Sequence, residues 1–233
     1  MMKHGDGKLS HLRSRSPNDL STIANLDDFA HGLSLTSEEK KRFASYDQCL
    51  SAWSQHTNLI AKSSFEDRWQ RHFVDSVQLW PLIPAEVTSV LDMGSGAGFP
   101  GLVLAILSVE RAPARHFTLV DSVGKKARFL REAAESADLT NVTSVAKRVE
   151  MFHVEQARYD LISARAMTAL PKLLDLAVPL LKPGGMLIFP KGERAQEELT
   201  AASERWRFNL QQHQSATHPK ASILVITEPK AIP

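Results

Sequence analysis

Three glycines at alternate positions follow a short apolar run and an acidic residue. The run covers residues 88–91, Asp92 closes it, and Gly94, Gly96 and Gly98 come next. Glycine lets a ligand approach the backbone closely and accepts the positive φ of a tight turn. In an open α/β sheet, ligands bind beyond the carboxyl ends of the strands, where a loop of this kind would lie. The spacing therefore predicts a cofactor site.

Two cofactors are compatible with this loop. Residues 96–101 satisfy the G-x-G-x-x-G pattern of dinucleotide-binding folds, and Asp121 lies twenty residues beyond Gly101, where it would accept hydrogen bonds from ribose hydroxyls. S-adenosylmethionine (SAM) has no pyrophosphate but carries a sulfonium and an ammonium group, so the carboxylate of Asp92 suits it better. Residues 180–185, Leu-Leu-Lys-Pro-Gly-Gly, also resemble a methyltransferase pattern. The sequence favours SAM, with an NAD-dependent oxidoreductase as the alternative.

The residues that often activate a methyl acceptor are missing from their usual places. The single cysteine, Cys49, falls in an expected N-terminal helix, away from every strand end, and is interpreted as an inert thiol. Where methyltransferases of exocyclic amines often carry Asn-Pro-Pro-aromatic, the sequence is Ser163-Ala164-Arg165-Ala166. An acceptor that is already nucleophilic, such as guanine N7, needs in-line positioning in water-poor surroundings and no base. The pattern fits such an acceptor, and a small-molecule acceptor is a further alternative.

Basic residues gather near the expected ends of strands and helices, where they could hold RNA phosphates. They are Arg68, Arg71, His72, Lys125, Lys126, Arg128, Arg131, Lys147, Arg148, Arg165, Lys191 and Arg194. Two of them have an ordinary alternative explanation. Arg128 with Glu132 and Arg131 with Glu135 stand four residues apart, the spacing of surface ion pairs on a helix.

Past residue 84 the chain alternates between strand and helix patterns. Strands are expected at residues 88–91, 116–120, 142–146, 159–163, 186–189 and 223–226. Helices are expected at residues 100–107, 124–137, 170–181 and 193–207. Such alternation predicts a mostly parallel sheet covered on both faces, which is an α/β fold.

The N-terminal third has a helical pattern. Thr36 and Glu39 are spaced as a capping box. Apolar and aromatic residues then recur every three or four positions in two stripes, at residues 43–60 and 65–80, and prolines end the second stripe. These aromatic side chains are expected to be packing groups.

The composition is that of an ordinary folded protein. The chain has 233 residues, of which 43% are hydrophobic and 23% charged, with a net charge of +2. One cysteine allows no disulfide and no multi-cysteine metal site, so no metal is expected. No apolar run approaches the length that crosses a bilayer, and no second exposed apolar stripe is evident. We expect a cytoplasmic monomer without membrane contact, divided into a disordered tail (1–18), a helical extension (19–84) and a SAM-binding domain (85–233).

Several separate motifs together resemble one family of enzymes. They are Asn58-Leu59, Arg71-His72-Phe73-Val74-Asp75-Ser76, the loop from Asp92 to Leu102, Leu119-Val120-Asp121-Ser122, Gly124-Lys125-Lys126, Phe129-Leu130, Arg148-Val149-Glu150, Ala164-Arg165-Ala166 and Lys191-Gly192. Over residues 36–226 the chain resembles the RsmG (GidB) family, bacterial methyltransferases that modify guanine N7 in small-subunit (16S) ribosomal RNA. The glycine loop alone indicates only a methyltransferase, whereas the Arg-His-x-x-Asp-Ser, Gly-Phe-Pro-Gly and Ala-Arg-Ala segments together are much more specific.

The resemblance implies a class I SAM-dependent methyltransferase: a Rossmann-like, seven-stranded, mostly parallel sheet with a helical N-terminal extension. The implied strand order is 3-2-1-4-5-7-6, with the last strand antiparallel. The implied substrate is 16S rRNA or the small ribosomal subunit, methylated by direct in-line transfer. A non-catalytic RNA-binding factor for ribosome assembly is the alternative.

The resemblance also assigns roles to individual residues. The cofactor contacts would be Gly94, Gly96, Phe99, Asp121, Val149, Glu150 and Arg165. The catalytic residues would be Arg165, His72 and Lys191, and the RNA contacts Arg71, Lys125 and Arg128. Two positions depart from the family pattern: Ile60 replaces a small hydroxyl residue, and Pro190 stands before Lys191 where a leucine is common.

Overall fold

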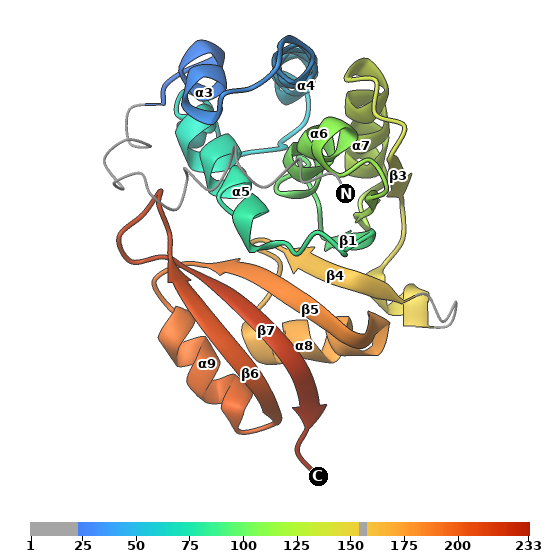
Figure 1. The fold of residues 1–233 in the computed structure, drawn as a ribbon, viewed down its shortest axis with the longest axis vertical. Helices are drawn as coiled ribbons and strands as arrows, with labels where there is room; N and C mark the ends of the chain where they lie inside the picture. The colour runs from blue at the N-terminus through green and yellow to red at the C-terminus, as the bar shows by residue number, and fades with distance from the viewer. Residues whose placement is uncertain (1–22, 154–157) are drawn as a thin grey trace, which may run out of the picture.

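A computed structural model describes residues 23–153 and 158–233 (Figure 1). One twisted sheet separates two groups of helices. Helices α3, α4, α6 and α7 lie together on one side of it, and α8 and α9 lie on the other (Figure 1). The tail expected at residues 1–18 lies outside the described residues, and the domain boundary expected at residue 84 stays a prediction.

The sheet has seven strands in the described part of the chain. They are β1 (Ser89–Met93), β2 (His116–Val120), β3 (Val142–Val145), β4 (Tyr159–Ala164), β5 (Leu181–Lys191), β6 (Trp206–Gln214) and β7 (Ser222–Ala231). Their order is β3-β2-β1-β4-β5-β7-β6, and β7 runs antiparallel to both of its neighbours. The expected order and the antiparallel last strand are confirmed. The carboxyl ends of β1, β2, β4 and β5 therefore meet at one edge, where ligands bind in such sheets.

Helices cover both faces of the sheet because successive strand residues point to opposite sides. In β1, Val90 packs on the side of α6 (Gly101–Arg111) and α7 (Gly124–Ser136), whereas Leu91 packs on the side of α8 (Leu170–Ala177) and α9 (Ala195–Ser203). Short 3-10 turns follow β3 and α8, at η4 (Val149–His153) and η5 (Val178–Leu180). Each face therefore has its own continuous hydrophobic core.

The N-terminal helices share the core on the α6 side. They are α3 (Leu26–Leu33), α4 (Ser37–Ser54), η1 (Lys62–Ser64), η2 (Trp69–Val74), α5 (Asp75–Val77) and η3 (Trp80–Leu82). The capping box before α4 is confirmed, with Glu39 N donating to Thr36 Oγ1 at 3.1 Å and Thr36 N donating to Glu39 Oε2 at 2.9 Å. The aromatic stripes also pack as expected, because Trp69 and Phe73 stack with ring centroids 4.0 Å apart.

The backbone of the second stripe is not the regular helix that the pattern indicated. Residues 62–82 form short 3-10 turns, one three-residue α-turn and a π-helix, η2. π-helical turns are rare in proteins, and those that occur are often found at functional sites. Here it carries Arg71 and His72 in its last turn.

Two expected helices end earlier than the sequence indicated. The helix expected at residues 193–207 ends at Ser203, and Trp206 and Arg207 already belong to β6, paired with Ala231 and Lys230 of β7. Most β6 side chains are exposed, so the strand has no apolar alternation that the sequence could reveal. Likewise α8 ends at Ala177, and β5 begins at Leu181.

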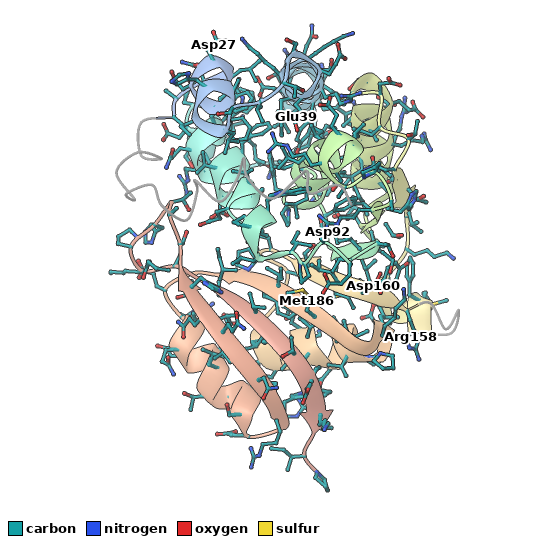
Figure 2. The ribbon with its side chains drawn as sticks, in the orientation of Figure 1. Asp27, Glu39, Asp92, Arg158, Asp160 and Met186 are labelled. Atoms are coloured by element: carbon teal, nitrogen blue, oxygen red, sulfur yellow. The ribbon has the colours of Figure 1, made fainter. Side chains whose placement is uncertain are left out.

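Asp160 joins three strands at the opposite edge of the sheet, near the start of β4 (Figure 2). Its Oδ2 accepts hydrogen bonds from the Ser89 amide at 2.8 Å and hydroxyl at 2.7 Å, and from the Thr88 amide at 3.1 Å and hydroxyl at 3.0 Å. Its Oδ1 accepts from Lys182 Nζ at 2.9 Å. This carboxylate ties together the starts of β1, β4 and β5.

Candidate functional site

The glycine loop follows β1 and is held by Asp121 at the end of β2. Gly94, Gly96 and Gly98 have φ of +65°, +56° and +90°, a region that side chains other than glycine rarely adopt. Gly96 N donates to Asp121 Oδ2 at 3.0 Å, and Val123 N donates to Asp121 Oδ1 at 2.8 Å. The two strand-end segments that the sequence singled out are thus joined by a nearly buried carboxylate.

Asp92 lies beneath this loop and does not face a ligand. Its side chain is fully buried, and its oxygens accept from Ser163 Oγ at 2.7 Å and from Gly101 N at 3.3 Å. The expectation that Asp92 stands directly against the positive charge of SAM is therefore wrong. Burial raises the pKa of this carboxyl to about 6, against the lowering effect of the hydrogen bonds from Ser163, Ser95 and Gly101. Asp92 supports the frame of the loop.

Apolar side chains stand exposed around the loop. Val123 follows β2, Met151 follows β3 and Met167 follows β4, with exposed fractions of 48%, 54% and 37%. Such side chains on three neighbouring loops at one sheet edge offer a surface for a flat apolar ring. Sequence reasoning missed them, because isolated apolar residues in loops carry no periodic signal. The nearby Val149 is buried in the core, whereas Glu150 is exposed.

Arg165, in the loop after β4, lies at the centre of a cluster that joins distant parts of the chain. Its Nη1 donates to His72 Nδ1 at 3.0 Å and makes longer contacts of 3.4 Å with Asp75 Oδ2 and the Arg71 carbonyl. Its guanidinium carbon lies 5.3 Å from the ring centroid of Phe99, against which the His72 ring stacks at 5.1 Å. The structure thus brings together Arg165 and His72, the residues to which the resemblance assigned catalysis, and Phe99, to which it assigned a cofactor contact.

The imidazole of His72 is neutral at physiological pH. Burial, together with the positive charges of Arg165 and Arg71, lowers its pKa to about 3. A group with so low a pKa is a poor general base for a reaction near pH 7. What His72 contributes to this cluster is therefore its hydrogen bonds, to Arg165 and to Ser64.

A cavity of about 640 Å³ opens beside this cluster. It lies between the loop after β4, the end of β5, the first turn of α9 and the turn between β6 and β7. Its walls include Asp75, Arg165, Met167, Lys191, Glu197 and Ser222. A volume of this size is in the range of small-molecule and nucleobase sites.

Met167 connects the cavity to the glycine loop. A Cβ built on Gly94 would lie 3.2 Å from Met167 Cγ, and Met167 also lines the cavity. The two candidate ligand sites are therefore neighbours, with one flexible side chain at their border.

Lys191 is part of the cavity wall and is committed to an ion pair. Its Nζ donates to Glu198 Oε2 at 2.8 Å and to the Thr168 carbonyl at 2.9 Å, and its side chain is only 8% exposed. Glu198 also accepts from the Leu170 amide at 2.8 Å, at the start of α8. Lys191 thereby fixes the position of the loop after β4 relative to α9.

The expected RNA contacts are less concentrated than the sequence implied. Arg71 is exposed beside His72, and Lys125 is exposed in the first turn of α7. Arg128 donates to Glu132 at 2.8 Å and lies over the ring of Trp53 on α4. This is the i,i+4 surface ion pair that the sequence spacing indicated as the alternative to an RNA contact for Arg128. Arg128 nevertheless remains 66% exposed, so its role toward RNA stays a prediction.

The topology separates the two cofactor alternatives. The common dinucleotide-binding order is 3-2-1-4-5-6, whereas this sheet inserts an antiparallel seventh strand between β5 and β6. A solved O-methyltransferase of Bacillus cereus in complex with SAH shares this fold, with a TM-score of 0.56 at 12% identity over 90% of this chain and 100% of that one. The strand order and the glycine loop are those of the class I SAM-dependent methyltransferase fold. The oxidoreductase alternative is not supported.

The sequence comparisons place the chain within this class. The family model GidB, rRNA small subunit methyltransferase G, matches residues 39–226. A protein named ribosomal RNA small subunit methyltransferase G from Rhodospirillum centenum is 40% identical over 223 residues, covering 94% of this chain and 96% of that protein. Another of the same name from Cereibacter sphaeroides is 43% identical over 195 residues, covering 84% and 92%. The chain belongs to the rRNA small subunit methyltransferase G family, and its cofactor is SAM.

Among residues 23–153 and 158–233, no helix is long and apolar enough to cross a membrane. Over the same residues, no three His, Cys, Asp or Glu side chains are grouped so that they could hold a metal ion.

Proposed function

We propose that this protein transfers a methyl group from SAM to N7 of a guanine in 16S rRNA, with the base held in the cavity beside Arg165. The observation that carries the proposal is that the cavity adjoins the glycine loop through Met167 and presents Arg165 at their junction. Membership of the family supports the rRNA substrate. The choice of guanine N7 rests on the resemblance and on the chemistry of the side chains.

The residues around the glycine loop suit the cofactor. The backbone at Gly96 is open to close approach, and at Gly94 the nearest obstacle is the flexible side chain of Met167. Arg165 lines the cavity and lies over Phe99, and Asp121, Val149 and Glu150 follow the two neighbouring strands. Exposed Val123 and Met151 offer apolar surface to the adenine ring. When bound, SAM supplies an activated methyl group on a sulfonium.

The side chains at the cavity favour an acceptor that needs no deprotonation. His72 is a neutral hydrogen-bond acceptor toward Arg165, and Lys191 is paired with Glu198, so neither is free to remove a proton. Guanine N7 has an available lone pair and can attack directly. The catalytic contribution of Arg165, His72 and Lys191 is then to orient the base and exclude water.

Exposed cations around the cavity extend the proposed RNA surface. Arg194 lines the cavity, Arg71 is exposed beside the cluster at Arg165, and Lys125 and Arg128 lie on α7. Cations in such positions bind the phosphate backbone with a strong dependence on salt. We propose the small ribosomal subunit or its rRNA as partner, with the enzyme acting as a cytoplasmic monomer.

The proposal is tested by methyl transfer from labelled SAM to small subunits from a strain that lacks the protein. Digestion of the 16S rRNA and mass spectrometry of its nucleosides should show new 7-methylguanosine. The matched variants are Arg165→Lys at the cavity and Arg205→Lys on the surface, where Arg205 pairs with Asp175. Only the first should lose activity, because lysine cannot reproduce the planar guanidinium. Label on another base would contradict the proposal, and absence of any transfer would favour a non-catalytic assembly factor.

A further inference from the structure

We infer that Ser64 positions Arg165 through His72, by fixing the imidazole tautomer that accepts the Arg165 hydrogen bond. Ser64 lies in η1, a hundred residues before Arg165, and neither motif nor resemblance singled it out. The inference rests on the proposed function for its meaning in catalysis. The series of hydrogen bonds from Arg165 through His72 and Ser64 to Ala61, called the relay below, can be measured independently of any reaction.

The protons in this relay are determined by the chemistry of its end groups. Arginine has only donors, so Arg165 Nη1, 3.0 Å from His72 Nδ1, must donate to a ring nitrogen that carries no proton. The single proton of the neutral ring is then on Nε2. That nitrogen lies 3.1 Å from Ser64 Oγ.

Ser64 can accept from His72 because its own proton is already used. The Ser64 hydroxyl donates to the Ala61 carbonyl at 2.8 Å, and the side chain is nearly buried, with 3% exposure. All hydrogen bonds therefore run in one direction, from Arg165 to His72, from His72 to Ser64 and from Ser64 to Ala61. If the ring carried its proton on Nδ1, it would present a donor to the guanidinium.

The relay fixes the direction in which Arg165 presents its remaining donors. Nη1 is used by His72, with Asp75 and the Arg71 carbonyl nearby. Nε and Nη2 make no hydrogen bond to any residue that the structure describes. The guanidinium plane is also held over Phe99, against which His72 stacks. Within the described part of the chain, these donors of Arg165 are thus left for cofactor and base.

The charges facing His72 keep the relay intact at neutral pH. Arg165 faces the His72 ring from the loop after β4, and Arg71 lies beside it on the same π-helix. The Asp75 carboxylate contacts Arg165 and makes no hydrogen bond to His72 among the described residues. Protonation of the ring would remove the acceptor for Arg165 and place two cations 3.0 Å apart. The lowered pKa of His72, about 3, agrees with this arrangement.

The first test is the tautomer of His72 in the full-length protein. Nuclear magnetic resonance of ¹⁵N-histidine-labelled protein, with the His72 signals assigned by comparison with a His72→Asn sample, should show protonated Nε2 and unprotonated Nδ1 between pH 5 and 8. Ser64→Ala should shift population toward the Nδ1-protonated form. A matched control is Ser108→Ala, which removes another buried hydroxyl donating to a carbonyl at 2.8 Å but without a histidine partner. Protonated Nδ1 in the wild-type enzyme would overturn the inference.

The second test is rescue by substitutions that keep one hydrogen bond at a time. Asparagine at position 72 can offer its oxygen near the place of Nδ1, whereas phenylalanine keeps only the stacked ring. We expect His72→Asn to retain methyl transfer within about threefold of wild type, and His72→Phe to lose at least about tenfold in kcat with KM for small subunits unchanged. Full activity of His72→Phe would show that the ring is only a packing group. Failure of the methylation assay in the wild-type enzyme would refute the proposed function and leave the tautomer result standing.

Discussion

Asp92 on β1 and Ser163 on β4 are register partners in the sheet, and the Ser163 hydroxyl donates to Asp92 Oδ1 over 2.7 Å. The second carboxylate oxygen accepts from the amide of Gly101, the first residue of α6. One buried carboxylate therefore joins the two strands from which the glycine loop and the Arg165 loop begin. Its ionisation affects the frame on which both ligand sites stand.

The stability of the protein should fall as Asp92 ionises. Because burial raises its pKa to about 6, above the value of about 3.9 in an unfolded chain, the contribution of Asp92 is fully present below about pH 4 and is lost as the pH rises through 6. The loss by pH 7.5 is about 3 kcal/mol. We expect Asp92→Asn to gain about this much relative to wild type between pH 4 and 7.5, measured as the free energy of unfolding in urea. For the surface variant Asp175→Asn, the difference in unfolding free energy from wild type should not change with pH. A pH-independent difference for Asp92→Asn would contradict the raised pKa of Asp92.

Gly94→Asp should abolish cofactor binding. The backbone at this position has φ of +65°, and any Cβ would already touch Met167 at 3.2 Å, so a carboxylate would occupy the space left for the ligand. Calorimetry with S-adenosylhomocysteine should show at least about a hundredfold loss of affinity, equivalent to about 2.7 kcal/mol. Gly124→Ala is the matched control, because a Cβ there meets nothing within 4 Å. Retained affinity in Gly94→Asp would mean that the cofactor does not approach this loop.

Glu198→Ala should destabilise the cavity wall. It removes the partner of Lys191, whose side chain is 8% exposed, and also an acceptor for the Leu170 amide. An uncompensated buried cation costs about 3 kcal/mol or more. We expect the free energy of unfolding to fall by about that amount, and Lys191→Met in the same chain to recover part of it. Glu197→Ala, which alters the exposed neighbouring carboxylate, should change stability by less than about 0.5 kcal/mol.

Asp160 should make the enzyme sensitive to acid. Burial alone would raise its pKa, but the donors from Ser89, Lys182 and Thr88 outweigh burial and hold the pKa well below its usual range. Its stabilising contribution is therefore present above about pH 4 and is lost as the pH falls further. Asp160→Asn should destabilise the protein at pH 7 by about 1–3 kcal/mol and reduce the loss on acidification, as followed by circular dichroism. An unchanged acid transition would show that the junction at Asp160 contributes little.

The sequence predicted the parts of the molecule that carry periodic or motif signals. The alternation of strands and helices after residue 84, the capping box at Thr36 and the glycine loop have such signals and are confirmed, whereas the strand order, also confirmed, was implied by the family resemblance. Strand β6 has none, because it is an exposed edge strand without apolar alternation, and its first residues were assigned to a helix. The resemblance named His72 and Arg165, but no spacing in the sequence indicates that Ser64 reaches the same ring.

The role of Asp92 shows a different limit of sequence reasoning. The chemistry of SAM made a carboxylate beside the glycines attractive as a direct contact. Strand pleating instead turns this side chain into the protein, toward Ser163 and Gly101. A motif can identify the ligand correctly while the reason first given for one of its residues is wrong.

The antiparallel direction of β7 places the β6–β7 turn at the edge of the sheet where ligands bind. Because β7 is antiparallel, its first residue, Ser222, pairs with Lys191 at the same edge where the parallel strands end. The β6–β7 hairpin turn, with Ser215 and Ala221, therefore closes one side of the cavity. A seventh strand running parallel would bring its opposite end to this edge and remove that wall. Reversal of a single strand thus gives this sheet a second walled recess beside the glycine loop, the recess in which we propose that the acceptor base is held.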